Sequence, residues 1–130
     1  MKFLCCKEIT VIACGGAVGS VSRFYLGKMC QAWLGASFPW GILLVNISGC
    51  FVIGFLVATL LDFFALNPLW RLLLLTGFLG GYTTFSGFTL DVIDMLQNNQ
   101  VLAAILYIMV TVILCLTATW IGVLVGQWWK

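Results

Sequence analysis

The sequence predicts an all-α integral membrane protein with four transmembrane helices, formed as one domain over residues 1–130. Three observations lead to this fold class. Hydrophobic residues make up 63% of the chain and charged residues only 8%, and the mean hydropathy is +1.16, far from the composition of a soluble domain. Four apolar segments reach the length of about 20 residues that a spanning helix needs. The connections between them are too short to form a separate soluble domain.

The predicted spans occupy residues 9–26, 38–61, 69–90 and 101–125. Each is continuously apolar, whereas strands of a transmembrane β-barrel are about 10 residues long and alternate apolar with polar positions. In the first and fourth spans, small residues recur four positions apart, a spacing that lets helix backbones approach closely. These pairs are Gly15 with Gly19, Gly16 with Ser20, and Gly122 with Gly126. We therefore expect both spans to pack tightly against neighbouring helices.

The amide of Asn46 lies in the middle of the second span, where it would be costly if it faced lipid. It is expected to face protein or water. In the fourth span, Tyr107, Thr111 and Cys115 recur every four residues and so share one face of the helix. Both features have a structural interpretation, hydrogen bonding within the bundle, and a functional one, a polar lining for a passing ion.

The third span is predicted to break near its middle. Gly80 and Gly81 can adopt backbone conformations that other residues avoid, and the hydroxyls of Thr83 and Thr84 can satisfy the backbone groups that a break leaves free. Freed carbonyl oxygens are hard ligands that suit alkali or alkaline-earth cations. Broken helices are a recurring way to build ion sites in transport proteins, and a flexible hinge without an ion is the alternative.

Two phenylalanines follow the expected break. Phe85 and Phe88 are three residues apart, so they project from the same face of a restarted helix. The edge of an aromatic ring carries partial positive charge. Such edges can stabilise a partly dehydrated anion without trapping it, although a phenylalanine pair in a membrane helix can equally face lipid or the core.

Basic residues are nearly balanced between the two sides of the membrane. Four spans place both termini and the second loop on one side, and the basic residues near the helix ends divide four against two. The first side carries Lys2, Lys7, Arg71 and Lys130, and the other carries Lys28 and Arg23. This weak bias favours cytoplasmic termini without enforcing them. The chain shows no internal repeat, so the inverted symmetry common in transport folds requires a second copy.

The composition argues against an enzyme, because the chain has no histidine and the usual nucleophile and base pairs cannot form. A nucleic-acid partner is not expected. The cysteines show no metal-ligand spacing and are expected to be small packing residues. They stand at positions 5, 6, 14, 30, 50 and 115.

Two other functions are alternatives to an ion-conducting one. A small proton-coupled multidrug exporter needs an ionisable carboxylate within the membrane, which argues against this function because all four acidic residues lie at or beyond the ends of the spans. They are Glu8, Asp62, Asp91 and Asp94. An accessory membrane subunit of a larger complex is the third possibility.

Three motifs in the same order as in a known family give the chain a resemblance over essentially its whole length. They are Gly15-Gly16-Ala17-Val18-Gly19-Ser20-Val21-Ser22-Arg23, Trp40-Gly41 with Asn46 and Gly49, and the stretch from Gly77 to Phe88. In these motifs the chain resembles members of the CrcB/Fluc fluoride channel family. The resemblance implies a channel that exports cytoplasmic fluoride passively across a bacterial inner membrane.

The resemblance also implies an assembly and a set of site residues. It implies a homodimer of two oppositely inserted subunits with two pores and a central structural sodium ion that is not transported. Backbone carbonyls of Gly80 and Thr83 would bind the sodium, and Arg23 would lie in a vestibule at the aqueous end of the first helix. Fluoride would pass Asn46, Phe85, Phe88, Ser86, Tyr107 and Thr111. The chain departs from the family pattern at Gly87, where many members have a small hydroxyl residue, and at Cys115, where serine is frequent.

Overall fold

Residues 6–129 are described by a computed structural model, and within this range every regular element is helical. Among these residues, three helices are long and apolar enough to cross a membrane. They are α1 (Cys6–Leu34), α2 (Trp40–Leu66), in which the apolar span is Trp40–Leu61, and α6 (Val101–Trp128). The predicted all-α class is confirmed. Lys2, Cys5 and Lys130, which entered the sequence arguments, lie outside the described residues.

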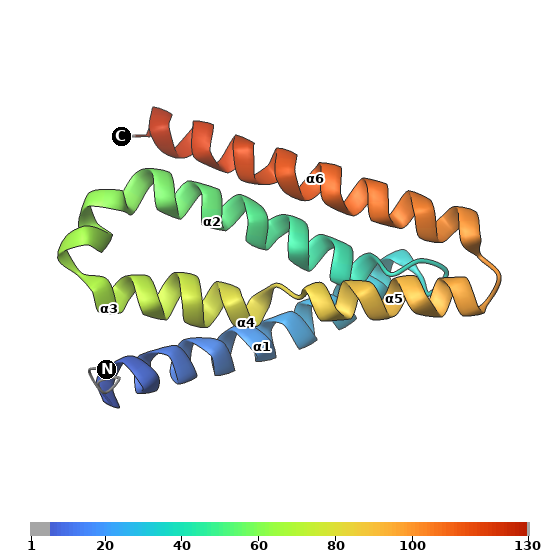
Figure 1. The fold of residues 1–130 in the computed structure, drawn as a ribbon, viewed down its shortest axis with the longest axis horizontal. Helices are drawn as coiled ribbons and strands as arrows, with labels where there is room; N and C mark the ends of the chain where they lie inside the picture. The colour runs from blue at the N-terminus through green and yellow to red at the C-terminus, as the bar shows by residue number, and fades with distance from the viewer. Residues whose placement is uncertain (1–5, 130) are drawn as a thin grey trace, which may run out of the picture.

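Four shorter elements stand where the third span was predicted. They are α3 (Pro68–Arg71), the π-helix η1 (Leu72–Leu79), α4 (Gly80–Tyr82) and α5 (Phe85–Gln97). Figure 1 shows them following one another across the molecule, with an interruption between α4 and α5. At the interruption, Thr83 (φ −82°, ψ 154°) and Thr84 (φ −148°, ψ 120°) are extended. The third segment is therefore broken.

The break lies a few residues later than the glycines from which it was predicted. Gly80 has helical dihedral angles (φ −63°, ψ −34°), and among the described glycines only Gly35 has a positive φ. Close packing explains the second glycine: a Cβ atom on Gly81 would lie 2.5 Å from the carbonyl oxygen of Gly16. Gly81 thus lets α4 approach α1, and the two threonines carry the extended backbone.

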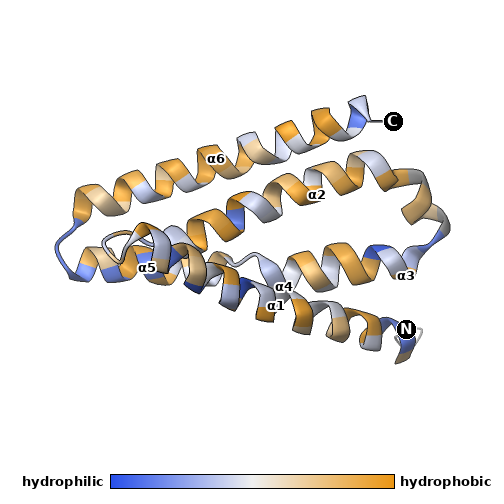
Figure 2. Cartoon of the chain, turned by 180° about the vertical axis from the view of Figure 1, so that it is seen from behind, coloured by the Kyte–Doolittle hydropathy of each residue, from blue (hydrophilic) through white to orange (hydrophobic). Residues whose placement is uncertain are grey.

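The chain crosses the molecule back and forth (Figure 1). The described ends of the chain lie at the same end as the connection between α2 and α3, and the α1–α2 and α5–α6 connections lie at the opposite end. Figure 2 shows that apolar residues dominate the helices and that the strongly polar positions gather near the connections. Large side chains of α6 such as Leu102 and Leu116 are more than two-thirds exposed, as expected for a surface that faces lipid or another subunit.

Small residues bring the helices into backbone contact, as their spacing predicted. Gly15 and Gly19 are the buried residues of α1, and a Cβ atom on either would collide with backbone atoms of η1. Ser20 extends the same contact, since its hydroxyl donates to the carbonyl oxygen of Gly81 at 3.4 Å. On α6, Gly122 and Gly126 lie against the backbone of α2. The close packing of α1 against η1, and of α6 against α2, therefore requires residues without large side chains at these positions.

We expect Gly19→Ala to destabilise the fold by about 1–3 kcal/mol, the usual cost of overpacking a close contact. A Cβ atom there would overlap the carbonyl oxygen of Phe78 and lie 2.9 Å from the backbone nitrogen of Tyr82, and helical backbone cannot move aside easily. Gly16→Ala is the matched control, because its Cβ atom would meet its nearest neighbour, the Gly77 carbonyl oxygen, only at 3.8 Å. Thermal unfolding of both variants in detergent tests this, and equal stabilities would contradict it.

The first helix continues beyond its predicted apolar span because a polar side chain organises its end. The Gln31 amide donates to the carbonyl oxygens of Gly35 and Phe38, both at 2.7 Å, and accepts from the backbone N–H of Gly41 at 3.0 Å. Gly35 ends α1 with a left-handed conformation (φ 96°), which glycine adopts without strain. Hydropathy alone could not place this boundary, since the last turns of α1 are partly polar.

Candidate functional site

Asn46 on α2 holds the break in the third segment. Its side-chain oxygen accepts the backbone N–H of Thr84 at 2.8 Å, and its side-chain nitrogen donates to the carbonyl oxygen of Thr84 at 3.0 Å. The side chain is 9% exposed. Both polar groups of an extended residue are thereby satisfied by one amide, which is the condition for irregular backbone at membrane depth. Asn46 therefore forms hydrogen bonds within the helix bundle, as its structural interpretation predicted. A second N–H of its amide remains for another acceptor.

Thr84 also starts the helix that follows the break. Its hydroxyl accepts the backbone N–H of Gly87 at 3.0 Å, the usual role of a threonine that precedes the first turn of a helix. From the sequence, Thr84 was expected only to help satisfy the backbone groups that the break leaves free. The signal for a more definite role was present, because threonine is among the preferred residues directly before a helix, and α5 begins at Phe85.

A cavity of about 340 Å³ lies beside the break, between α2, α5 and α6. None of the described residues that line it is charged. Four of the residues predicted to contact a permeating ion share this cavity with two cysteines. The lining includes Asn46, Phe85, Phe88, Thr111, Cys50 and Cys115. The structure thus brings together residues from three elements that lie far apart in the sequence, although their roles in conduction stay predictions.

The two phenylalanines have unequal environments. Phe88 is 6% exposed, whereas Phe85 is 76% exposed, and their ring centroids are 5.5 Å apart with the planes tilted by 47°. Phe88 also contacts the ring of Tyr107, at a centroid distance of 5.2 Å. The Phe88 ring is therefore part of the packed core, whereas the Phe85 ring lies on the surface of the single chain.

Thr111 carries the one buried side-chain oxygen that lacks a hydrogen-bond partner among the described residues. The residue is 6% exposed and lines the cavity. A buried hydroxyl without a partner is unfavourable by about 1–3 kcal/mol in proteins. A hydroxyl kept in this state beside a cavity is ready to bond to whatever occupies it.

Two residues of the predicted polar track lie outside the cavity. Tyr107 is fully buried in the core, and its hydroxyl donates to a carboxylate oxygen of Asp91 at 3.1 Å. Ser86 is exposed and its hydroxyl pairs with that of Thr84 at 3.1 Å. Within the cavity the track therefore consists of Thr111 and Cys115, the two remaining members of the fourth-helix stripe.

Asp91 lies next to the site, through its hydrogen bond with Tyr107. From the sequence it was expected only to lie beyond the third span. Burial raises the pKa of its carboxyl group, the hydrogen bond from Tyr107 lowers it in part, and the nearby charge of Asp94 raises it further. A signal existed, because Asp91 follows Phe88 by three residues and so extends the same face of α5. Its contact with Tyr107 across two helices could not be inferred from that spacing.

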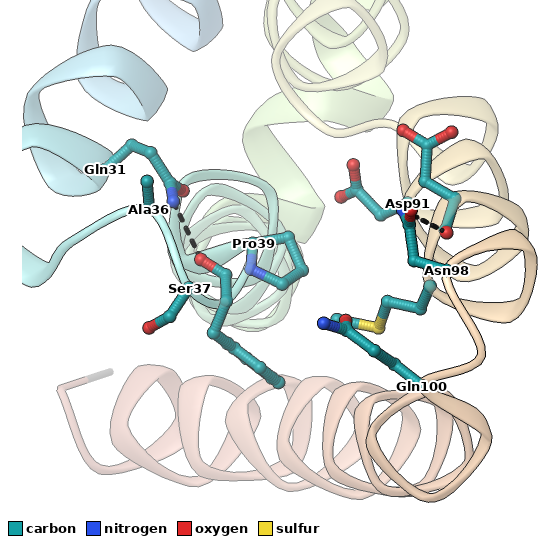
Figure 3. A pocket seen from close by; sticks show the side chains of 10 residues that line it. Gln31, Ala36, Ser37, Pro39, Asp91, Asn98 and Gln100 are labelled. Atoms are coloured by element: carbon teal, nitrogen blue, oxygen red, sulfur yellow. Dashed lines mark hydrogen bonds between the residues drawn. The ribbon is translucent and has the colours of Figure 1, made fainter.

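Polar recesses lie at the end of the molecule that carries the α1–α2 and α5–α6 connections. One, of about 280 Å³, lies between the α1–α2 connection, which contributes Ser37 and Pro39, and the end of α5 with Asn98 (Figure 3). Another, of about 290 Å³, is lined by Arg23, Lys28 and Asp91. Arg23 therefore lines a recess at this end of the molecule. The vestibule position that the family resemblance implies for it stays a prediction.

Gly80 and Thr83, the predicted sodium ligands, line a small recess of about 190 Å³. The Thr84 N–H, which would bond to the Gly80 carbonyl if the helix continued, is bonded to Asn46 instead. Within the part of the chain that the structure describes, the Thr83 carbonyl accepts a single, long hydrogen bond, 3.3 Å from an Arg23 guanidinium nitrogen. Neutral carbonyl oxygens with few protein donors fit a hard alkali cation. Among the described residues, no group of three Cys, Asp or Glu side chains is placed to hold a metal.

Apolar membrane-length helices, an interrupted helix and an uncharged cavity beside the interruption define a helical membrane protein of the kind that builds sites from broken helices. A family model, described as CrcB-like protein, Camphor Resistance (CrcB), matches residues 10–123. The chain belongs to the CrcB family.

Several relatives bear the name "Fluoride-specific ion channel FluC". The protein from Rhizobium johnstonii is 44% identical over 118 residues, which are 91% of this chain and 94% of that protein. The protein from Aquifex aeolicus is 42% identical over 92% of this chain and 96% of its own length. The protein from Methylococcus capsulatus is 41% identical over 92% of this chain, but the match spans only 53% of that longer protein. These names are those of channels and not of enzymes, in agreement with the sequence analysis.

Proposed function

We propose that this protein is a fluoride-selective ion channel that lets cytoplasmic fluoride leave passively across the inner membrane. The observation that carries the proposal is the identity of 41–44% to proteins named as fluoride-specific channels. The cavity supplies suitable chemistry. Its lining is neutral, so an anion can be attracted by dipoles and still leave, as conduction requires.

The geometry supports a stabilising role for several groups along the proposed route. The hydroxyl of Thr111 has no hydrogen-bond partner within residues 6–129, and the Asn46 amide keeps one N–H after its bond to Thr84. Both can replace water on a dehydrating fluoride ion. The Phe85 and Phe88 rings stand at 47° to each other, so one can present an edge where the other presents a face. Selectivity would come from this sparse set of small donors.

The channel is proposed to work as a homodimer of two oppositely inserted subunits. The large exposure of Phe85 (76%) supports this arrangement, because a second chain would convert a surface ring into a pore wall. The near balance of basic residues permits either orientation in the membrane. One chain also offers few helices to enclose a pore.

A structural sodium ion is proposed at the dimer centre, held by the Gly80 and Thr83 carbonyl oxygens of both subunits. The ion would add fixed positive charge and join the two broken segments. We expect replacement of sodium by a bulky organic cation on both sides of the membrane to abolish fluoride flux. The test is fluoride efflux from liposomes that contain only this protein. It is measured with a fluoride electrode in sodium and in N-methylglucamine buffers. Unchanged flux would show that transport does not require a sodium ion at the Gly80 and Thr83 carbonyls.

Purified protein in liposomes should release fluoride rapidly and chloride not at all. Equal release of both ions would refute the proposed selectivity. Empty liposomes measure the background leak. Protein that forms a stable dimer but carries neither ion would instead favour the accessory-subunit function.

We expect Phe85→Ile to lower fluoride efflux at least about tenfold, which corresponds to about 1.4 kcal/mol on the barrier. Isoleucine keeps an apolar side chain but removes the positive ring edge. Phe63→Ile is the control, since Phe63 is also exposed (42%) and lies near the far end of α2. Similar efflux from the two variants would exclude a special role for the Phe85 ring.

A further inference from the structure

Two thiols face the cavity from opposite helices. Cys50 on α2 and Cys115 on α6 both line it, and both are free and half-buried. The backbones of α2 and α6 also meet nearby. One turn further along, a Cβ atom on Gly54 would collide with the carbonyl oxygen of Thr119. The pair is therefore held together by backbone contact between α2 and α6.

The surroundings of this pair favour soft ligands over hard ones. Among the described residues that line the cavity there is no carboxylate, so a hard divalent cation such as magnesium or calcium would find no anionic oxygen ligand there. Thiolates select soft cations. Two of them on the wall of one cavity suit a cation that accepts two ligands in a line, and the neighbouring Leu116 and Phe88 provide an apolar surround.

We propose that Cys50 and Cys115 form a two-thiolate site for a soft cation of the copper(I), silver(I) or mercury(II) class. With mercury(II), both S–H bonds break, two S–Hg bonds form and two protons pass to the buffer, with no change in oxidation state. The bound ion occupies the cavity between Asn46 and Leu116. Binding follows from the thiol pair alone, whereas closure of the ion route by the bound cation rests on the proposed function.

The binding test uses the full chain with the four other cysteines replaced by Cys5→Ser, Cys6→Ser, Cys14→Ala and Cys30→Ala. Mercury(II) chloride is titrated into the purified protein while thiolate–mercury absorption and proton release are followed. We expect one ion per chain and affinity that rises with pH, because the ligands must lose protons. Adding Cys50→Ala or Cys115→Ser should weaken binding at least about a hundredfold through loss of the second, intramolecular ligand.

The outcomes separate this proposal from the proposed function. Equal affinity in the two-thiol protein and both one-thiol variants overturns the site, whatever the protein transports. In liposomes, stoichiometric mercury(II) should stop fluoride efflux of the two-thiol protein, and excess dithiothreitol should restore it. Each one-thiol variant, compared with its own untreated flux, should keep most of its efflux at the same concentration. Tight binding with undiminished efflux overturns closure of the route and leaves the site intact.

Discussion

Thr111→Val should slow fluoride efflux strongly while making the protein more stable. The substitution keeps the shape of the side chain and removes the buried hydroxyl that has no partner among the described residues. Removal of an unsatisfied polar group should stabilise the fold by about 1–3 kcal/mol. If that hydroxyl serves the permeating ion, efflux should fall at least about tenfold, since a stabilising contact along the route is lost.

Thr117→Val provides the matched control for this result. Thr117 lies on the same helix, six residues further, and is exposed, so the same chemical change there should alter neither efflux nor stability appreciably. Thermal unfolding in detergent and fluoride-electrode recordings are made on the same preparations. Parental efflux from Thr111→Val would exclude its hydroxyl from the ion route, and lower stability would reveal a structural partner for it.

Asn46→Asp is expected to abolish efflux, with a loss of at least about a hundredfold, equivalent to about 2.7 kcal/mol. The ionised carboxylate can still accept the Thr84 N–H, but it cannot donate to the Thr84 carbonyl oxygen, which the amide nitrogen now contacts at 3.0 Å. One buried carbonyl thus faces a negative oxygen, and the new charge repels an approaching anion. We therefore expect a less ordered backbone at Thr84 and a higher energy barrier to fluoride passage.

Asn67→Asp makes the same chemical change at a helix end, where the amide donates only to Phe63 at 3.1 Å. It should leave efflux near the parental rate. Limited proteolysis near the break and fluoride efflux are compared for both variants. Parental efflux from Asn46→Asp would mean that its amide contributes to neither the break nor the ion route.

The sequence predicted the helical class and the broken third segment because both follow from local composition. It placed the break at Gly80 and Gly81, although Thr83 and Thr84 carry it, because glycine permits both irregular backbone and close packing and the sequence does not say which. The four-span topology stays a prediction, since the described third segment is divided among short elements.

The contacts of the site were harder to predict because they join distant positions. Asn46 was recognised as a costly amide, but its partner Thr84 lies 38 residues away. The Tyr107 hydroxyl could be placed on a helix face, but its bond to Asp91 depends on how α5 and α6 cross. The exposure of Phe85 depends on what covers it, which the sequence of one chain does not specify.

The wide turns of η1 make the chain tolerant of a change in length at this point. Each residue of an ordinary α-helix turns the chain by about 100°, so a deletion within α2 or α6 rotates everything downstream. A π-helix has wider turns, with i→i+5 hydrogen bonds, and η1 covers Leu72–Leu79. Loss of one residue from Leu72–Leu75 should therefore rewind η1 toward ordinary α-helix while Gly77 and Gly81 still meet Gly15 and Gly16 on α1. We expect single-residue deletions to be tolerated better in η1 than in the two long helices.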